Sequence, residues 1–481
     1  RYAPDRREYD FTATSSATNP ETLKAQYDFQ SPNDQQTDLF NGFILEPGTI
    51  VRRYDELVDD NLDLSGKFVW DVFDSGVSFA QLTTGVQVIS RARDADSATY
   101  GFNVNQVRDD LLRTSNLLVS DVVYSCDDAA ASIECGAETA RGISNNANTG
   151  LVFVDKTLAS DSYDAELEYN SAYVMYDHTF DSSWQVIVGG RYETYKQITN
   201  TFSLQGEQGS VQSVIDEDSI LPSVGVNWFV ADTHQLRFAL SQTVARPDFK
   251  EAANATFYDN EFNVRVRGNP FLEISNIINA DLRWEWYLSE IDNLSVALFY
   301  KDMDKPIERV VQAASGTAGN TRTFQNSDSA ALYGVELDGR FEFILGDGYD
   351  QTLFFAFNAA FIESEVSANN QEDRSLQGQP EYTANLIFGY DHVSAGHQLT
   401  VLLNQNGKSI ADVGVSGQPD VFLEPRLDLN VVYRFGISDS LTLKAKLENL
   451  LDDEIEYTQG GQVFQVYNRG PSIQVGLDWQ F

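Results

Sequence analysis

The chain has 481 residues with 72 acidic and 33 basic side chains, so its formal net charge is −39. Binding to a phosphate backbone requires clustered cations, and this charge excludes a nucleic-acid partner. Aromatic residues make up 12% of the sequence, which excludes an acidic disordered chain. We interpret the acidic balance as solvated loops and a surface that faces water or lipopolysaccharide.

Taken in chain order, the first sixty residues carry two weak strand patterns, at 5–14 and 21–30. From about residue 61 onward, apolar and polar residues alternate with period two, mostly over ten residues or more. The clearest segments are 184–192, 236–240, 282–288, 294–300, 353–357, 399–403, 427–435 and 473–481. The pattern predicts an all-β chain with about 15–17 strands.

The connections between these segments alternate between short and long. Short polar turns are expected near residues 75, 182, 232, 291, 347, 395 and 438. Long segments rich in Asn, Ser, Gly and Asp cover 95–164, 199–218, 247–274, 312–324, 367–380, 409–424 and 453–469. One end of the sheet should therefore carry tight turns and the other large loops.

The strand lengths match the ~9–11 residues that a tilted strand needs to cross hydrocarbon. Backbone groups must all be paired in lipid, so strands span only as a closed barrel, with the apolar stripe toward lipid. We therefore expect an antiparallel transmembrane β-barrel of the outer-membrane type. Its short turns and C-terminus would be periplasmic and its long loops extracellular, with 95–164 as the largest loop region.

The predicted strand count is odd, whereas complete single-chain bacterial barrels have even counts. We expect residues 1–481 to be the C-terminal portion of one larger barrel, with its first strands before Arg1.

Catalytic and metal sites are not expected. The four histidines, His178, His234, His392 and His397, are scattered without triad or metal-ligand spacing. The acids at 59–63 resemble the start of a calcium loop, but Leu64 stands where glycine is required. Cys126 and Cys135 lack the partners of a zinc site, so we interpret them as a loop disulfide. No cofactor is expected.

Several stretches resemble the C-terminal barrel of TonB-dependent outer-membrane receptors. They are SQTVARPDF (241–249), the run from GNPFLE to KPIE (268–308), YGVELDGRFEF (333–343), ENLLDDEIEY (448–457) and the terminal Phe481. The resemblance covers most of residues 165–481. It implies a 22-stranded barrel around an N-terminal plug domain, neither of which is complete in this chain.

The resemblance also implies partners and a signal. The partners would be outer-membrane lipid and lipopolysaccharide, the absent plug and first strands, the TonB complex acting through them, and a surface lipoprotein as a further candidate. The family's terminal aromatic is read by the barrel-assembly machinery, which would assign that signal to Phe481 together with Trp479.

For ligand contact, the loop 249–271 is the best candidate because it mixes aromatic rings with arginines. The candidate residues are Phe249, Phe257, Tyr258, Phe262, Arg265 and Arg267. Packing of this loop onto the barrel rim is the competing explanation. The predicted function is TonB-dependent import of a scarce ligand, oligosaccharide-like or siderophore-like. The alternatives are a passive diffusion porin and a structural or adhesive barrel that binds partner proteins.

Overall fold

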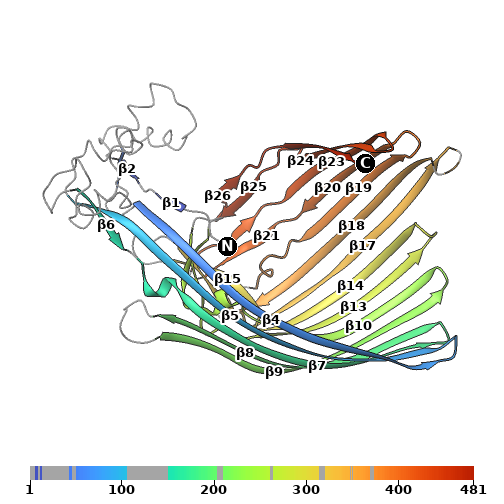
Figure 1. The fold of residues 1–481 in the computed structure, drawn as a ribbon, viewed down its shortest axis with the longest axis horizontal. Coiled ribbons are helices and arrows are strands. Elements are labelled where there is room, and N and C mark those ends of the chain that lie inside the picture. Colours follow the sequence, from blue (N-terminus) through green and yellow to red (C-terminus); the bar gives the residue numbers. More distant parts are fainter. Residues whose placement is uncertain are drawn as a thin grey trace. The chain divides into compact units, whose positions relative to one another are not determined.

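The computed structural model describes residues 6–8, 11–13, 43–45, 50–105, 150–155, 157–202, 210–259, 264–313, 320–346, 348, 350–368, 373–415 and 417–480. Strands make up nearly all of its regular structure (Figure 1). Within this described part, no helix has the length and apolar character needed to cross a membrane.

The principal sheet has 17 strands among the described residues. They are β1 (Arg6–Glu8), β4 (Ile50–Asp74), β5 (Phe79–Asn105), β6 (Gly150–Asp155), β7 (Tyr163–Phe180), β8 (Trp184–Phe202), β9 (Ser210–Ala231), β10 (His234–Ala245), β13 (Ser275–Tyr287), β14 (Asn293–Asp304), β17 (Ser329–Leu345), β18 (Gln351–Ser367), β19 (Tyr382–His392), β20 (His397–Asn406), β23 (Arg426–Ser438), β24 (Leu441–Glu448) and β27 (Ser472–Trp479). From β9 to β27 each strand pairs antiparallel with the next one in this sheet. The predicted all-β antiparallel architecture is confirmed.

A second sheet is built from the long connections. Its order is β11 (Thr256–Asp259), β12 (Val264–Arg267), β16 (Asn320–Asn326), β15 (Ile307–Ala313), β21 (Ser409–Gly414), β22 (Val421–Leu423), β25 (Ile455–Gln459) and β26 (Gln462–Tyr467). We call it the loop sheet. The remaining elements are β2 (Phe11–Ala13), β3 (Phe43–Leu45), η2 (Ala159–Asp161) and α4 (Phe249–Ala252).

The chain divides into two compact units. The smaller one contains Arg1–Asp59, Arg93–Asp164 and Thr201–Ser210. Within it, Arg93 Nη2 lies 2.6 Å from Asp59 Oδ2, and the rings of Tyr54 and Tyr100 meet edge to face at 6.0 Å. The larger unit contains Asp60–Ala92, Ala165–Asn200 and Val211–Phe481, and it holds the whole loop sheet.

All seven short turns predicted from the sequence lie between the expected strands. Two predicted long segments have the wrong bounds. In 199–218, β8 continues to Phe202 and β9 begins at Ser210. In 95–164, β5 continues to Asn105 and β6 covers Gly150–Asp155. Thr199, Ser213 and Ile215 are buried in the parts of β8 and β9 that fall within 199–218. Buried and exposed positions still alternate there, but both are occupied largely by polar residues, so the hydropathy pattern does not reveal the strand.

Two weak strand patterns were predicted near the start of the chain. The first, 5–14, contains β1 and β2, and the second, 21–30, lies outside the described residues.

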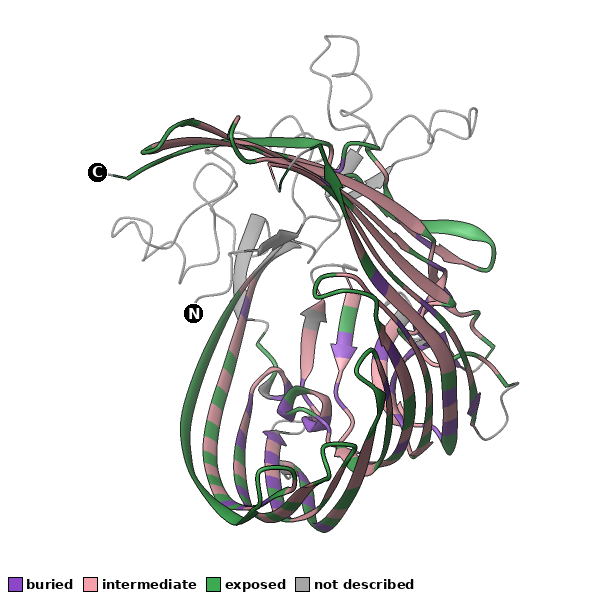
Figure 2. Ribbon diagram, turned by 90° about the vertical axis from the view of Figure 1, so that its right-hand side faces the viewer, coloured by how far each residue is buried: buried purple, intermediate pink, exposed green. Residues whose placement is uncertain are grey.

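Alternation along the strands places apolar and polar residues on opposite faces of the principal sheet, and Figure 2 shows the resulting bands of exposure. One face carries a cross-strand row of apolar side chains: Phe238, Leu282, Leu298, Val335 and Phe361. Four of these five side chains, all except Val335, are strongly exposed. An exposed apolar belt of this kind is the surface that faces lipid in a membrane barrel.

The opposite face carries a polar row that crosses eight strands. Its members are consecutive register partners: Gln235, Glu285, Ser295, Asp338, Asn358, Asn385, Asn404 and Asp428. Two acidic members of the row are paired with a neighbouring arginine. Arg283 Nε lies 2.9 Å from Glu285 Oε1, and Arg283 Nη2 lies 2.7 Å from Asp338 Oδ2. We call this face the polar face.

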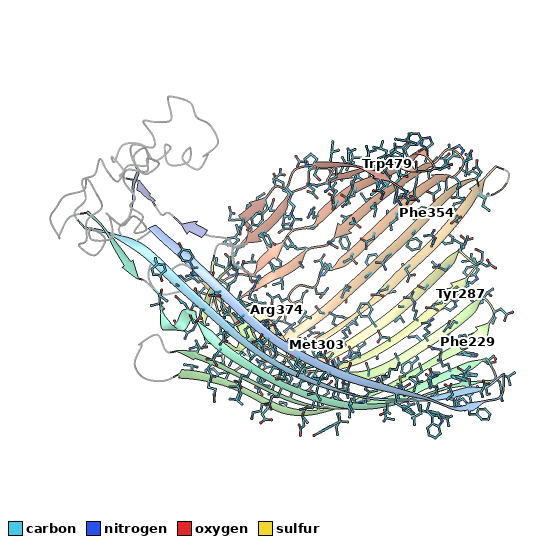
Figure 3. All side chains as sticks on the ribbon, in the orientation of Figure 1. Phe229, Tyr287, Met303, Phe354, Arg374 and Trp479 are labelled. Carbon is cyan, nitrogen blue, oxygen red and sulfur yellow. The ribbon has the colours of Figure 1, made fainter. Side chains whose placement is uncertain are left out.

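Aromatic side chains gather where strands meet the short turns. Phe229 and Tyr287 lie at such strand ends, and Trp479 is the last residue of β27, as Figure 3 shows. Trp184 and Trp228 stack here at 5.0 Å, and rings at this level suit a membrane interface.

Candidate ligand-facing site at the loop end

The segment after β10 begins with a short capped helix. Asp248 precedes α4, and its carboxylate accepts a hydrogen bond from Lys250 N at 3.1 Å. The Glu251 carboxylate in turn accepts one from Asp248 N at 2.9 Å, which completes a capping box. The arrangement fixes the direction in which the loop leaves the strand.

A group of buried and half-buried side chains holds the start of this loop against β8. Glu193, nearly buried, receives Arg191 Nε on one oxygen and Arg246 Nη2 on the other, each at 2.7 Å. The Arg246 guanidinium lies 4.6 Å from the centre of the Tyr195 ring. We call Arg191, Glu193, Tyr195 and Arg246 the wall cluster. Two arginines sharing one carboxylate leave this patch locally positive in a strongly acidic chain.

The predicted ligand residue Phe249 packs into the molecule. Its side chain is 3% exposed, and the Arg91 guanidinium lies 5.0 Å from its ring centre. Gly268 closes the same loop, because a Cβ there would lie 2.0 Å from the carbonyl oxygen of Ala253. The structure thus gives Phe249 a packing role, and its contact with ligand stays a prediction.

Most of the other predicted ligand residues come together on the β11–β12 hairpin. Phe257 pairs with Val266, and Tyr258 pairs with Arg265. Arg265 is exposed, Arg267 Nε donates to Asn254 Oδ1 at 3.0 Å, and the Lys250 ammonium lies 4.2 Å from the Phe257 ring centre. Phe262 and the side chain of Tyr258 lie outside the described residues.

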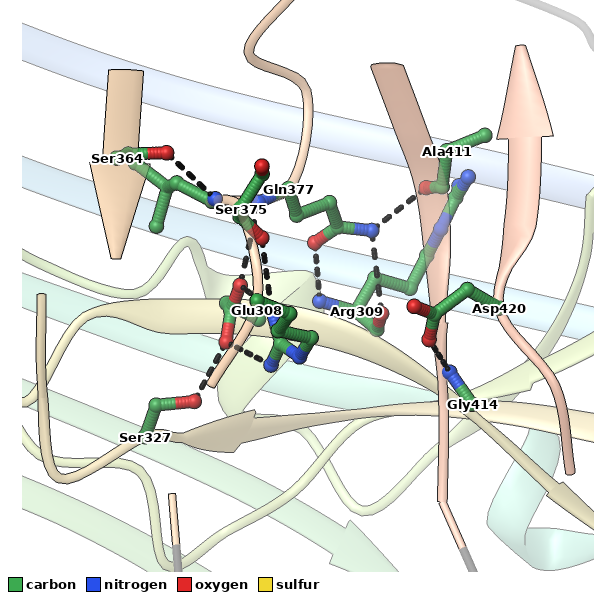
Figure 4. A network of polar contacts seen from close by, with 11 residues as sticks. Glu308, Arg309, Ser327, Ser364, Ser375, Gln377, Ala411, Gly414 and Asp420 are labelled. Carbon is green, nitrogen blue, oxygen red and sulfur yellow. Dashed lines mark hydrogen bonds and ion pairs between the residues drawn. The ribbon is translucent and has the colours of Figure 1, made fainter. Parts of the chain in front are cut away.

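A buried carboxylate at the start of β15 organises the loops beside this hairpin (Figure 4). Glu308 is 1% exposed and binds Arg374 in a two-pronged ion pair, with oxygen to nitrogen distances of 2.8 and 2.6 Å. The Ser327 hydroxyl donates to the same carboxylate at 2.5 Å. Burial opposes ionisation of Glu308, but Arg374 and Ser327 together hold its pKa below the ordinary value. This carboxylate ties the β18–β19 connection to β15.

Gln377, from the same connection, bridges two loop strands. Its amide oxygen accepts from Arg309 N at 2.6 Å. Its amide nitrogen donates to the carbonyl oxygens of Arg309 at 3.1 Å and Ala411 at 2.6 Å (Figure 4). One side chain therefore performs the hydrogen bonding of a strand residue between β15 and β21.

A second buried carboxylate joins two hairpins, and one of its arginines reaches a third. Asp412 on β21 is fully buried and binds Arg309 on β15 and Arg322 on β16. Arg309 Nη1 also lies 3.3 Å from Asp259 on β11. Removing one member of such a buried group leaves an uncompensated charge, which typically costs about 3–5 kcal/mol. These contacts make the loop sheet a single cross-linked unit.

Sequence patterns did not identify Glu308, Arg322, Gln377 or Asp412. Each lies among many acids, arginines and glutamines in loop segments, and only the pairing of distant hairpins brings them together. Within the described residues, no three His, Cys, Asp or Glu side chains are placed to hold a metal ion.

Three other predicted features have different outcomes. Cys126 and Cys135 lie outside the described residues, as does Phe481. Trp479 is the last residue of β27, and its side chain is exposed. Its role in barrel assembly stays a prediction.

Comparison with protein families matches residues 1–450 to the model described as TonB dependent receptor-like, beta-barrel. Among curated proteins, an iron-regulated outer membrane virulence protein of Vibrio cholerae is 26% identical over 226 residues, which cover 45% of this chain and 32% of that protein. The chain therefore spans only part of this relative's length.

Three solved structures share the fold. The siderophore receptor PiuA of Acinetobacter baumannii has a TM-score of 0.55 and 13% identity over 90% of this chain and 56% of its own. The ferric yersiniabactin uptake receptor FyuA of Yersinia pestis has a TM-score of 0.53 and 13% identity, over 90% of this chain and 56% of its own. The ferric-catecholate import receptor Fiu of E. coli has a TM-score of 0.53 and 12% identity, over 94% of this chain and 58% of its own.

Proposed function

Because the chain belongs to the TonB-dependent receptor β-barrel family, we propose that it is the C-terminal portion of a receptor that imports a scarce ligand across the outer membrane. Members of this family are outer-membrane receptors and not enzymes. The family match over residues 1–450 carries the proposal. The exposed apolar belt and the polar face agree with a barrel wall between lipid and a filled lumen.

The orientation follows from the same proposal. The short turns and the C-terminal end of β27 would lie in the periplasm, and the loop sheet would lie outside the cell. The polar face would line the lumen and contact the plug, through which TonB delivers energy.

We favour a siderophore-like ligand over an oligosaccharide-like one. The curated relative is named as iron-regulated, and the three structures are named as receptors for siderophores or ferric chelates. The positive wall cluster agrees with an anionic chelate, because it offsets the acidic balance near the loops. The β11–β12 hairpin, with Arg265 exposed, is the proposed contact surface.

Uptake of radioactive iron chelates by cells that express the complete receptor tests this proposal. We expect accumulation that a protonophore abolishes, since import would depend on the proton-motive force. Uptake that persists with the protonophore, together with steady single-channel conductance, would instead identify a passive porin.

The same assay tests the hairpin. We expect Arg265→Gln to lower the affinity for the transported chelate several-fold, because an exposed guanidinium is lost from the contact surface. Lys67→Gln is the control, since Lys67 is exposed on β4 and outside the loop sheet. Equal affinity in the two variants would remove Arg265 from the site while leaving the transport proposal intact.

A further inference from the structure

All four histidines lie at the short-turn end of the principal sheet, although they are scattered in the sequence. His234 is the first residue of β10, His392 is the last residue of β19, and His397 is the first residue of β20. His178 stands two residues before the end of β7. Each of these strand ends leads into a short turn, so the histidines mark one level of the barrel wall.

Two of these histidines lie side by side on the face that carries the exposed apolar belt. His392 is the register partner of Gln351 on β18 and of His397 on β20. Gln351 and the belt residue Phe361 are ten positions apart on the same strand, which places them on one face of the sheet. The pair of histidines therefore continues the belt toward the turns.

The half-buried ring of His397 is held by aromatic neighbours on β23. It stacks on Phe435 with 4.6 Å between the ring centres, and its Nδ1 lies 2.7 Å from the Tyr433 hydroxyl oxygen. With that hydroxyl as the donor, the neutral imidazole carries its proton on Nε2. Nε2 has no hydrogen-bond partner in the part of the chain that the structure describes, which leaves an N–H donor at this level of the wall.

Carboxylates lie just beyond this level, in the turns. The seven short turns contain no lysine or arginine, and five of them contain an acid. The side chain of Asp350 is 42% exposed, and its Oδ2 lies 3.3 Å from His392 Nε2. Arg340 and Arg434, at the same end, lie on the polar face. From the belt toward water, this side of the wall therefore presents apolar groups, then an N–H donor among aromatic rings, then a carboxylate.

That order of groups is complementary to the headgroup of an aminophospholipid, in which the phosphate lies next to the acyl chains and the primary ammonium lies nearer to water. We propose that His397 and Asp350 bind phosphatidylethanolamine of the surrounding leaflet. His397 Nε2–H donates to the phosphate, and the Asp350 carboxylate accepts from the ammonium. His392 lies between them and positions Asp350. This inference rests on the proposed placement of the apolar belt in lipid, and it does not depend on which ligand the receptor imports.

Native mass spectrometry of the complete receptor in detergent micelles tests this. The probes are dioleoyl phosphatidylethanolamine, phosphatidylglycerol and phosphatidylcholine, each titrated separately. We expect phosphatidylethanolamine to bind at least fivefold more tightly than the other two. Phosphatidylglycerol lacks the ammonium, and the ammonium of phosphatidylcholine has no N–H group to donate. Equal affinity for the three lipids would overturn the proposal and leave the membrane placement intact, whereas retention of no lipid would overturn both.

One substitution tests the phosphate contact. His397→Phe keeps an aromatic ring beside Phe435 but removes the N–H donor, and it should weaken phosphatidylethanolamine binding at least threefold. His234→Phe is the matched control, because this ring stacks with tryptophans and forms no ion pair within the described residues. It should leave the affinity unchanged. An equal loss in the two variants would overturn the proposal.

A second substitution tests the ammonium contact. Asp350→Asn keeps an oxygen that accepts from Ser394 N, so the turn is retained, but it removes the negative charge. We expect the preference for phosphatidylethanolamine over phosphatidylglycerol to fall at least threefold. The affinity for phosphatidylcholine, unchanged in every variant, shows that the folded wall is intact. An unchanged preference in Asp350→Asn would overturn the proposal.

Discussion

At the scale of single residues, Gln377 shows how one side chain replaces part of a strand. Its three hydrogen bonds to Arg309 and Ala411 satisfy backbone groups of two strands that come from different loops. Buried backbone groups must find partners, and a glutamine amide offers both a donor and an acceptor in peptide-like geometry. These hydrogen bonds join the β15 and β21 segments.

We expect Gln377→Ala to destabilise the loop sheet locally by about 1–3 kcal/mol, because three bonds are lost at roughly 1 kcal/mol each. Faster hydrogen exchange at β15 and β21 amides would report the loss. Gln474→Ala is the matched control, since that exposed side chain makes one bond to Glu448. Comparable exchange in the two variants would mean that Gln377 does not join the strands in solution.

At the scale of elements, the loop sheet combines small apolar clusters with buried ion pairs. Its apolar clusters are small, with Val311, Val421 and Tyr457 in one and Val310 and Ile410 among the members of another. Glu308 and Asp412 bind arginines from other segments between and beside them. Stability of this sheet should therefore respond to pH.

Two buried carboxylates act in opposite directions: burial raises the pKa of Asp412, and the contacts of Glu308 lower its pKa, so the response is predicted here for Glu308 alone. Its pKa in the folded protein lies below the ordinary glutamate value of about 4.3, so it favours folding above that pH. This contribution is lost as the pH falls through the lowered pKa. Hydrogen exchange at β15 and β16, corrected for intrinsic rates, should show protection that falls on acidification below about pH 4.3.

Glu308→Gln isolates this effect from other acids in the sheet. We expect the variant to be less protected than the natural protein near neutral pH and to converge with it in strong acid. A constant difference between the two proteins at every pH would show that the Glu308 charge does not contribute.

At the scale of the whole molecule, the two faces of the principal sheet require different surroundings. Leu298 lies in the exposed apolar belt, and Asn358 lies in the polar row. Arginine on the lipid face of a barrel costs about 2–4 kcal/mol at the membrane midplane and much less on the lumen face.

We therefore expect Leu298→Arg to lower the free energy of unfolding from phospholipid vesicles by about 2–4 kcal/mol. Asn358→Arg should cost much less, because Asn358 lies in the polar row on the face opposite the apolar belt. Urea titration with the protein folded into vesicles measures both. An equal loss in the two variants would contradict the assignment of faces.

The alternating segments, the seven short turns and the antiparallel order followed from the sequence alone. Period-two alternation is local, since each side chain's face is set by its own position in the strand. The polar stretches of 199–202 and 210–218 were misassigned for a related reason: alternation between polar residues gives no hydropathy signal, although the strand continues.

Only the tertiary structure decided how the loops combine. Glu308 meets Arg374, and Asp412 meets Arg309 and Arg322, across 66 to 103 residues of sequence. Such pairs depend on which hairpins become neighbours, and a single sequence does not specify that choice among so many acids and arginines. The sequence determined the barrel wall because its pattern is local, and the tertiary structure decided the loop sheet because its contacts are distant.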